Sequence, residues 1–175
     1  MNKVKTSTPS LEGEPGWIAL DSAEEYSTEP SFVLGDQSTD RFAVKYFVRE
    51  SDKQLFGKVY FGKGTQGPPG NAHGGAMAAV LDEAMGFSAW ITGQTVVAAK
   101  IEIEFFQMLP VNSVVTVEAW VESVEGRKVR AKGKIYEGDK VFSSSEGLFI
   151  NIPVEKFGDA SHYLHKVKAR LNKQD

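Results

Sequence analysis

The stretch from Gly70 to Trp90 constrains the fold of this chain more than any other. It follows a Gly-Pro-Pro run and then becomes rich in alanine and methionine. This change predicts a helix that begins at Gly74 or Gly75 and ends at Trp90 or Ile91, before Thr92-Gly93. Such a helix would be about 25 Å long, enough to cross a small domain. Because nearly all of its positions are apolar or small, we expect it to be buried on most sides.

Two adjacent carboxylates, Asp82 and Glu83, interrupt this apolar helix, and carboxylates are rarely buried without partners. Helical geometry turns Glu83 about 100° away from Asp82. Asp82 falls on a stripe of small residues formed by Gly75, Ala78 or Ala79, and Gly86. One interpretation is that a ligand or the backbone of another chain approaches Asp82 along this stripe. The other is that the stripe only lets the helix lie close to a sheet, with Asp82 bonded to a nearby backbone N–H.

Strand patterns lie on both sides of the predicted helix. Two runs precede it and four follow it, with a glycine- and proline-rich loop at 62–72, and the six strand runs are 41–49, 54–61, 95–108, 114–123, 128–136 and 141–150. Three-residue hairpin loops with a central glycine are expected at 125–127 and 137–139. The pattern predicts an α+β domain in which a long helix packs on an antiparallel sheet of about six strands.

The predicted domain occupies residues 41–152. Residues 1–40 are expected to form an N-terminal tail, flexible up to about residue 16, with a short helix near residues 23–26. Residues 153–175 are expected to form a C-terminal helical tail. Its histidines, His162 and His165, have no third ligand at a matching offset, so we expect no metal site.

Composition excludes several classes of function. The chain has no cysteine, which rules out disulfides, thiolate metal sites and a cysteine nucleophile. Its net charge of −3 argues against nucleic acid as the main partner. No apolar run reaches the ~20 residues of a membrane span, since Asp82 and Glu83 cut the best candidate. We therefore expect a soluble protein with a cytoplasmic location.

A basic stripe at positions 128, 130, 132 and 134 does not change this conclusion. A loop centred on Gly126 would place Glu122 opposite Arg130, Trp120 opposite Lys132 and Glu118 opposite Lys134. Acid–base pairs across neighbouring strands on a solvated face account for the stripe without a polyanion.

The sequence His73-Gly74-Gly75 stands where the predicted helix begins. The first amides of a helix have no partner within it and carry the positive end of its dipole, and glycine lets a ligand come close to them. This suits a carbonyl oxygen that gains negative charge. Asp82 lies about 12 Å further along the axis, so one helix does not readily aim both groups at one carbon. The spacing therefore suggests a site shared between two subunits.

Six residues separate this His-Gly-Gly from Asp82, and Ala84 and Gly86 follow shortly after. With this pattern, residues 40–152 resemble the PaaI-like branch of the hotdog-fold acyl-CoA thioesterases. The resemblance implies a long helix wrapped by an antiparallel sheet. It implies that Asp82 is the general base or nucleophile, that the Gly74 amide polarises the thioester carbonyl, and that His73 helps to position the site. It also implies an acyl-CoA substrate, with coenzyme A as part of it, no other cofactor or metal, and a homodimer or dimer of dimers.

The chain departs from the family pattern at two places. Ala98 and Ala99 stand where relatives often carry threonine or serine on the strand after the helix. Asn71 lies only two residues before the histidine, closer than the amide side chain of some relatives. We expect Asn71, Gly75 and Met85 to contact substrate, although Met85 also suits an ordinary core.

Three hypotheses follow for function. The first is hydrolysis of an acyl-CoA thioester. The second is a dehydratase or hydratase acting on acyl thioesters, in which a histidine base would make His73 more important than Asp82. The third is a dimer that binds acyl groups or coenzyme A without turnover, which the alanines at positions 98 and 99 favour.

Overall fold

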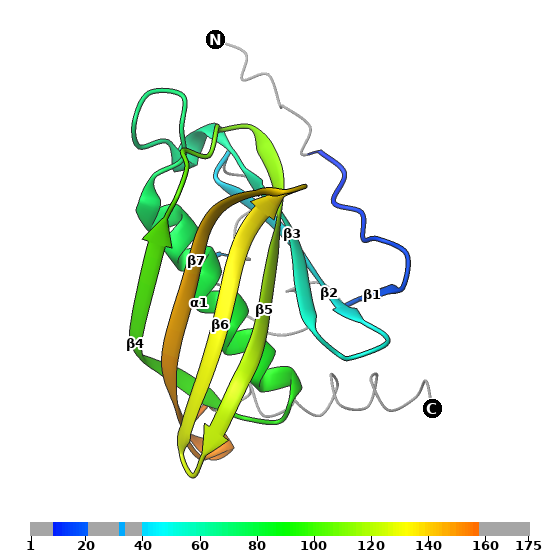
Figure 1. The fold of residues 1–175 in the computed structure, drawn as a ribbon, viewed down its shortest axis with the longest axis vertical. Coiled ribbons are helices and arrows are strands. Elements are labelled where there is room, and N and C mark those ends of the chain that lie inside the picture. The colour runs from blue at the N-terminus through cyan, green and yellow to red at the C-terminus, as the bar shows by residue number, and fades with distance from the viewer. Residues whose placement is uncertain (1–8, 21–31, 34–39, 158–175) are drawn as a thin grey trace.

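The computed structural model describes residues 9–20, 32–33 and 40–157 of the chain. Within them, one α-helix packs against a seven-stranded sheet whose neighbouring strands are all antiparallel (Figure 1). The strand order is β1-β2-β3-β5-β6-β7-β4. The elements are β1 (Trp17–Ala19), β2 (Phe42–Arg49), β3 (Leu55–Phe61), α1 (Gly74–Ile91), β4 (Val96–Phe105), β5 (Ser113–Glu125), β6 (Lys128–Glu137) and β7 (Lys140–Asn151), with 3-10 helices η2 (Lys63–Thr65) and η3 (Val154–Phe157).

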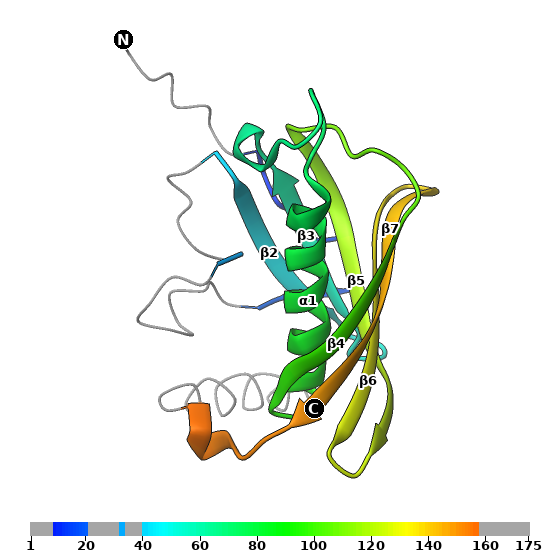
Figure 2. The ribbon, with the colours of Figure 1, turned by 90° about the vertical axis from the view of Figure 1, so that its left-hand side faces the viewer.

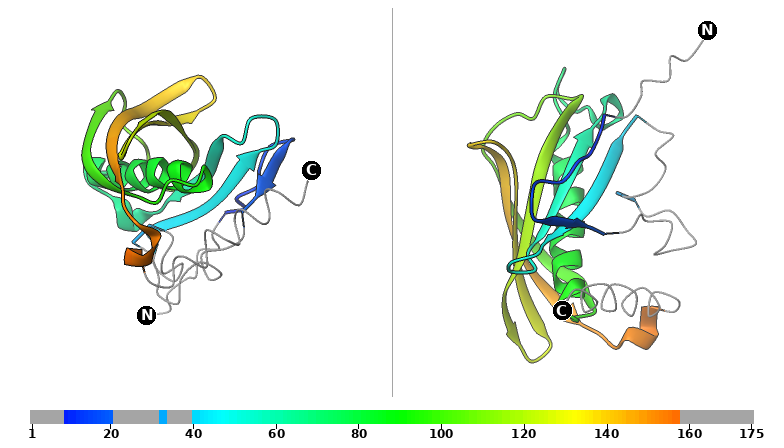
Figure 3. Two further views of the ribbon diagram at one scale, coloured as in Figure 1. Left: turned by 90° about the horizontal axis from the view of Figure 1, so that it is seen from below. Right: turned by 90° about the vertical axis from the view of Figure 1, so that its right-hand side faces the viewer.

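The helix α1 lies along the concave face of this sheet. Figure 2 shows it running beside the strands, and the end-on view in Figure 3 shows the sheet curling around it. Its buried residues are Met77, Val80, Leu81, Ala84, Met85, Ser88, Ala89 and Ile91. Gly133 on β6 gives this face room, because a Cβ atom there would lie 3.3 Å from Leu81 and 3.4 Å from Met85. The core is thus the space between α1 and the sheet.

This architecture confirms the predicted fold class. The helix and the six predicted strands all form, and the expected separation of Asp82 from Glu83 follows from the helix. Both hairpin loops after β5 and β6 are shorter than predicted, however. Glu125 pairs with Lys128 and Glu137 with Lys140, so the loops hold two residues each, with Gly126 at φ 58° and Gly138 at φ 55°. A positive φ at the first loop position is what glycine supplies in two-residue hairpins.

The predicted pairing of the basic stripe is correct at two of three positions. Trp120 lies opposite Lys132 and Glu118 opposite Lys134, but Arg130 lies opposite Ser123, because a bulge shifts the register between Val121 and Ser123. Lys132 instead bonds Glu122 at 2.7 Å and Glu146 at 3.0 Å, while Lys134 bonds Glu118 at 2.9 Å. Two of the four basic residues of the stripe, Lys132 and Lys134, are therefore paired with carboxylates.

Only residues 9–16 of the tail that we predicted to be flexible lie within the described ranges, and their end is held on the β2–β3 hairpin, since the carbonyl of Gly16 accepts the N–H of Glu50 at 3.0 Å. The next residue, Trp17 in β1, stacks on Phe56 with ring centroids 4.4 Å apart. Glu14 bonds Lys58 at 2.8 Å, and β1 extends the sheet beyond β2. The covered face of β2 holds Phe47, which is 3% exposed. These contacts pair distant residues, so local composition did not reveal them.

Other predictions on the two ends of the chain lie outside the described residues. They are the short helix near residues 23–26 and nearly all of the C-terminal helical tail, including His162 and His165. The domain boundaries at residues 40 and 152 stay predictions. In the part of the chain that the structure describes, α1 is the longest helix, and neither it nor any other helix is long and apolar enough to cross a membrane.

Candidate active site

His73 forms the N-terminal cap of α1. Its backbone N–H donates to the carbonyl of Thr65 at 2.7 Å, and its Nδ1 atom accepts the N–H of Gly75 at 2.8 Å. An acceptor at Nδ1 places the ring proton of neutral His73 on Nε2. Histidine is not among the common capping residues, so the sequence did not indicate this role. The cap fixes where the helix begins.

The cap leaves Gly74 as the open donor at the helix start. The amides of Ala76 and Met77 donate to the carbonyl of His73, and the amide of Gly75 is used by the His73 ring. Among the described residues, no acceptor lies on the N–H of Gly74. The predicted contribution of Gly75 to substrate binding therefore does not involve its amide in this structure, whereas the Gly74 amide is free for a ligand.

Asn71 belongs to the tight loop that leads into the cap. Its side-chain nitrogen donates to the carbonyl of Pro69 at 3.0 Å, and its backbone bridges to Pro110. The neighbouring amide of Ala72 donates to the carbonyl of Leu109 at 2.8 Å. Asn71 thus supports the loop from within, and its contact with substrate stays a prediction.

Asp82 lies two turns along the helix and is half-buried. Its carboxylate makes no hydrogen bond or ion pair within the described ranges, so the predicted alternative of a bond to a backbone N–H does not occur there. Burial raises the pKa of Asp82 above its ordinary value of 3.8, because leaving water disfavours the charged form. Glu83 is engaged differently, since its Oε1 accepts the hydroxyl proton of Tyr46 at 3.1 Å. The two neighbouring carboxylates therefore have separate environments.

The free amide and the half-buried carboxylate belong to one straight helix and lie about 12 Å apart along its axis. The Gly74 amide therefore cannot hydrogen-bond a thioester carbonyl group whose carbon is attacked beside Asp82 of the same chain. Within one chain, the Gly74 amide and the Asp82 carboxylate lie too far apart to act on one carbonyl group. A second copy of the helix would have to bring the two groups together.

Met85, one helical turn after Asp82, lies in the core. It has no exposed surface, and its sulfur accepts the hydroxyl of Ser145 at 3.3 Å. Met77 is 4% exposed and contacts Ser143 in the same way at 3.9 Å. Met85 is therefore a core residue in the single chain, and its contact with substrate stays a prediction.

Ala98 and Ala99 lie exposed on β4, the last strand in the sheet order. The register of β4 against β7 shifts between Ala98 and Lys100, so Ala99 is an extra residue on this edge. Neither alanine supplies a hydroxyl group. Within residues 9–20, 32–33 and 40–157, no group of three histidine or carboxylate side chains gathers as a metal site would require.

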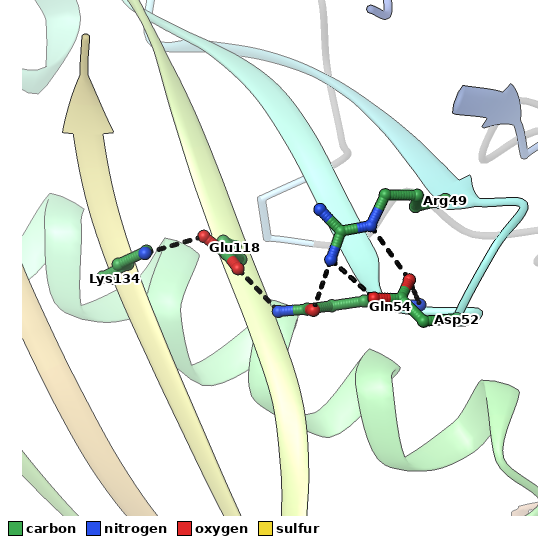
Figure 4. A network of polar contacts seen from close by, with 5 residues as sticks. All are labelled: Arg49, Asp52, Gln54, Glu118 and Lys134. Carbon is green, nitrogen blue, oxygen red and sulfur yellow. Dashed lines mark hydrogen bonds and ion pairs between the residues drawn. The ribbon is translucent and has the colours of Figure 1, made fainter. Parts of the chain in front are cut away.

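A cavity of about 420 Å³ lies at the opposite end of α1, between Ile91, Leu55 and Ala119. Its polar rim is part of a network in which Arg49 bonds both Asp52 and Gln54, Gln54 donates to Glu118 at 2.6 Å, and Glu118 pairs with Lys134 at 2.9 Å (Figure 4). The bond from Arg49 also lowers the pKa of Asp52. Because these groups satisfy one another, we assign the cavity a structural role and place the candidate site at Gly74 and Asp82.

The raised pKa of Asp82 predicts how stability depends on pH. The folded protein binds this proton more tightly than the unfolded chain does, so stability falls as pH rises from the ordinary pKa through the folded one. We expect Asp82→Asn to raise the melting temperature at neutral pH. The gain should shrink as the pH falls from the folded pKa toward 3.8, and it should be lost below 3.8, where the wild-type group is neutral in both states. Thermal unfolding of the wild type and Asp82→Asn, from neutral pH to below 3.8, measures this gain in melting temperature. A gain that does not change with pH would contradict a raised pKa at Asp82.

Comparison with known proteins gives a consistent result. Residues 69–142 match the model of the thioesterase superfamily. The acyl-coenzyme A thioesterase THEM4 of Bos taurus is 32% identical over 135 residues, which is 76% of this chain and 56% of that protein. The chain spans about half the length of the curated relatives it matches.

Solved structures agree on the architecture. A thioesterase superfamily protein has a TM-score of 0.59 and 32% identity, covering 62% of this chain and 54% of its own. The PaaI protein of the E. coli phenylacetic acid degradation operon has a TM-score of 0.56 over 64% of this chain and 80% of its own, and at 15% identity it bears on the fold alone.

Proposed function

This chain belongs to the thioesterase superfamily and has the hotdog fold, and on that premise we propose that it hydrolyses an acyl-CoA thioester to a free acid and coenzyme A. One observation carries the proposal. Asp82 is a half-buried carboxylate without a bonding partner in the described chain, on a stripe of small residues. An unpaired acid in this setting costs stability, and such a cost is typical of functional sites.

In the proposed reaction Asp82 acts as general base. It takes a proton from water while the water oxygen attacks the thioester carbonyl carbon, and its raised pKa makes it a stronger base than an exposed aspartate. The N–H of Gly74 and the positive end of the helix dipole stabilise the oxyanion that forms. The tetrahedral intermediate then collapses, the carbon–sulfur bond breaks, and coenzyme A leaves as a thiolate that takes up the proton held by Asp82, which regenerates the base. Direct attack by Asp82 as a nucleophile is the alternative route.

His73 has a positioning role in this scheme. Its Nδ1 atom holds the amide of Gly75 and so orients the first turn of α1. A dehydratase would instead use the histidine as its base, but the nitrogen that would accept the proton is already occupied by the cap. The observed bond therefore favours hydrolysis over dehydration.

We further propose a homodimer in which each site takes Gly74 from one subunit and Asp82 from the other. Two features support it. The helix separates these groups by about 12 Å within one chain, and β4 ends the sheet order with Val97 42% exposed, so this edge is open to a second copy. A dimer of such dimers would use other surfaces. A cytoplasmic location stays a prediction.

Release of free thiol from acetyl-, octanoyl-, palmitoyl- and benzoyl-CoA tests the proposed activity. We expect turnover of at least one of these substrates by the wild-type protein. Binding of all of them without turnover would establish the third hypothesis, a non-catalytic acyl-CoA-binding dimer, which the missing hydroxyl groups at positions 98 and 99 favour.

A further inference from the structure

Phe105, the last residue of β4, lies against the first residue of α1. A Cβ atom on Gly74 would lie 3.3 Å from Cζ of Phe105 and 3.5 Å from its Cε1. The far end of the ring thus contacts the backbone of the glycine whose N–H is open. Any group that accepts a hydrogen bond from Gly74 has the Phe105 ring as its neighbour.

The position of this ring at the end of a row explains why it is partly uncovered. Ile101 and Ile103 precede it at alternate positions of β4, and both pack against the core beside the helix. Because α1 begins at Gly74, the helix covers only part of the last ring in the row. Phe105 is 52% exposed. An apolar surface therefore borders the helix start and lies partly in water.

We infer that Phe105 determines acyl specificity, and that the site prefers substrates whose apolar acyl group is long or wide enough to cover this ring. The inference rests on the proposed function. A thioester held at Gly74 has two arms, an acyl group and the amide-rich chain of the coenzyme. The exposed ring offers the coenzyme amides no hydrogen bond, whereas an alkyl or aryl group covers it and removes apolar surface from water. The acyl arm is thus the better fit to the ring.

The size of the preference follows from the area that the ring can shield. Each methylene taken out of water improves binding by about fourfold, so two or three methylenes on the ring give at least tenfold. The acetyl group is too short to cover the ring, so acetyl-CoA does not gain this affinity. We therefore expect octanoyl-CoA and benzoyl-CoA to have higher kcat/KM than acetyl-CoA.

The test measures kcat/KM of the wild type, Phe105→Ala, Phe105→Leu and Phe106→Ala on these three substrates. Phe106 is a matched control, because it is 55% exposed and the atoms nearest a Cβ on Gly74 all belong to Phe105. We expect Phe105→Ala to lower the octanoyl-to-acetyl ratio about tenfold, Phe105→Leu to recover part of it, and Phe106→Ala to leave it unchanged.

Several results would overturn the inference while leaving hydrolysis intact. They are an equal loss on all three substrates in Phe105→Ala, the same change of ratio in Phe106→Ala, or a loss of the wild-type oligomer in Phe105→Ala by size-exclusion chromatography. If the wild type hydrolyses no acyl-CoA, the proposed function fails separately. The ratio of octanoyl-CoA to acetyl-CoA affinity, measured by calorimetry on the wild type and Phe105→Ala, then decides the role of the ring.

Discussion

Replacing Asp82 by asparagine is expected to lower kcat/KM for the best acyl-CoA substrate by about 100-fold or more, the contribution typical of a general base. Asparagine keeps the shape of the side chain but does not accept a proton from water. Since the unneutralised acid costs stability, the variant should be inactive and yet at least as stable as the wild type at neutral pH. Steady-state thiol release and a melting curve on the same samples measure both quantities.

Glu83→Gln is the matched control for this change. Glu83 is the next carboxylate on the helix, and glutamine retains an oxygen that accepts the Tyr46 hydroxyl. We expect this variant to keep activity within about threefold of the wild type, because Glu83 is turned about 100° away from Asp82 on the helix and glutamine keeps the bond to Tyr46. Equal losses in the two variants would show that loss of charge on the helix, rather than the Asp82 carboxylate, is responsible.

The second large effect is expected from Gly74→Pro, which removes a single N–H group from the site. Proline is favoured at the first helical position, and the preceding residue, His73, already has the extended ψ of 139° that a following proline requires. The helix should therefore form as before. Loss of one oxyanion donor typically lowers kcat by about 100- to 1,000-fold, and we expect a loss in this range.

Gly74→Ala separates the effect of the amide from that of added bulk. Alanine adds the same Cβ atom, which the half-exposed end of the Phe105 ring can accommodate by a small shift from 3.3 Å, but it keeps the N–H. We expect it to remain at least about tenfold more active than Gly74→Pro. If the alanine and proline variants lose activity equally, the amide has no catalytic role and crowding at the helix start accounts for the loss.

The central features of this molecule could be predicted from local sequence. The bounds of α1, the strands that follow it and the different environments of Asp82 and Glu83 all come from periodicity, which short-range geometry determines. The raised pKa of Asp82 has the same local origin, because an acid on an otherwise apolar helix loses water wherever that helix packs. The residues of the proposed half-site therefore lie largely within α1.

The features that could not be predicted from the sequence depend on contacts between distant residues or on single backbone atoms. Trp17 packs on Phe56 across nearly forty positions, and no local pattern indicates such a partner. The His73 cap depends on one ring nitrogen meeting one amide. Phe105 shares the alternating pattern of Ile101 and Ile103, and this pattern does not show that the helix begins too late to cover its ring. The bulge at Val121–Ser123 likewise arises from how two strands pair rather than from either strand alone.

The most direct test of a site shared between two subunits mixes the two variants that are expected to be inactive. Asp82→Asn and Gly74→Pro chains, carrying different affinity tags, are unfolded and refolded together in equal amounts. Acyl-CoA hydrolysis is then measured in the mixture and in each variant treated alone.

If each site takes Gly74 from one subunit and Asp82 from the other, half of the dimers are mixed and each mixed dimer has one intact site. The mixture should then recover about one quarter of wild-type activity, a gain of at least tenfold over either variant on the expected losses. Activity that stays at the level of the two separate variants, in a mixture in which both tags are recovered on one dimer, would contradict a site built from two chains.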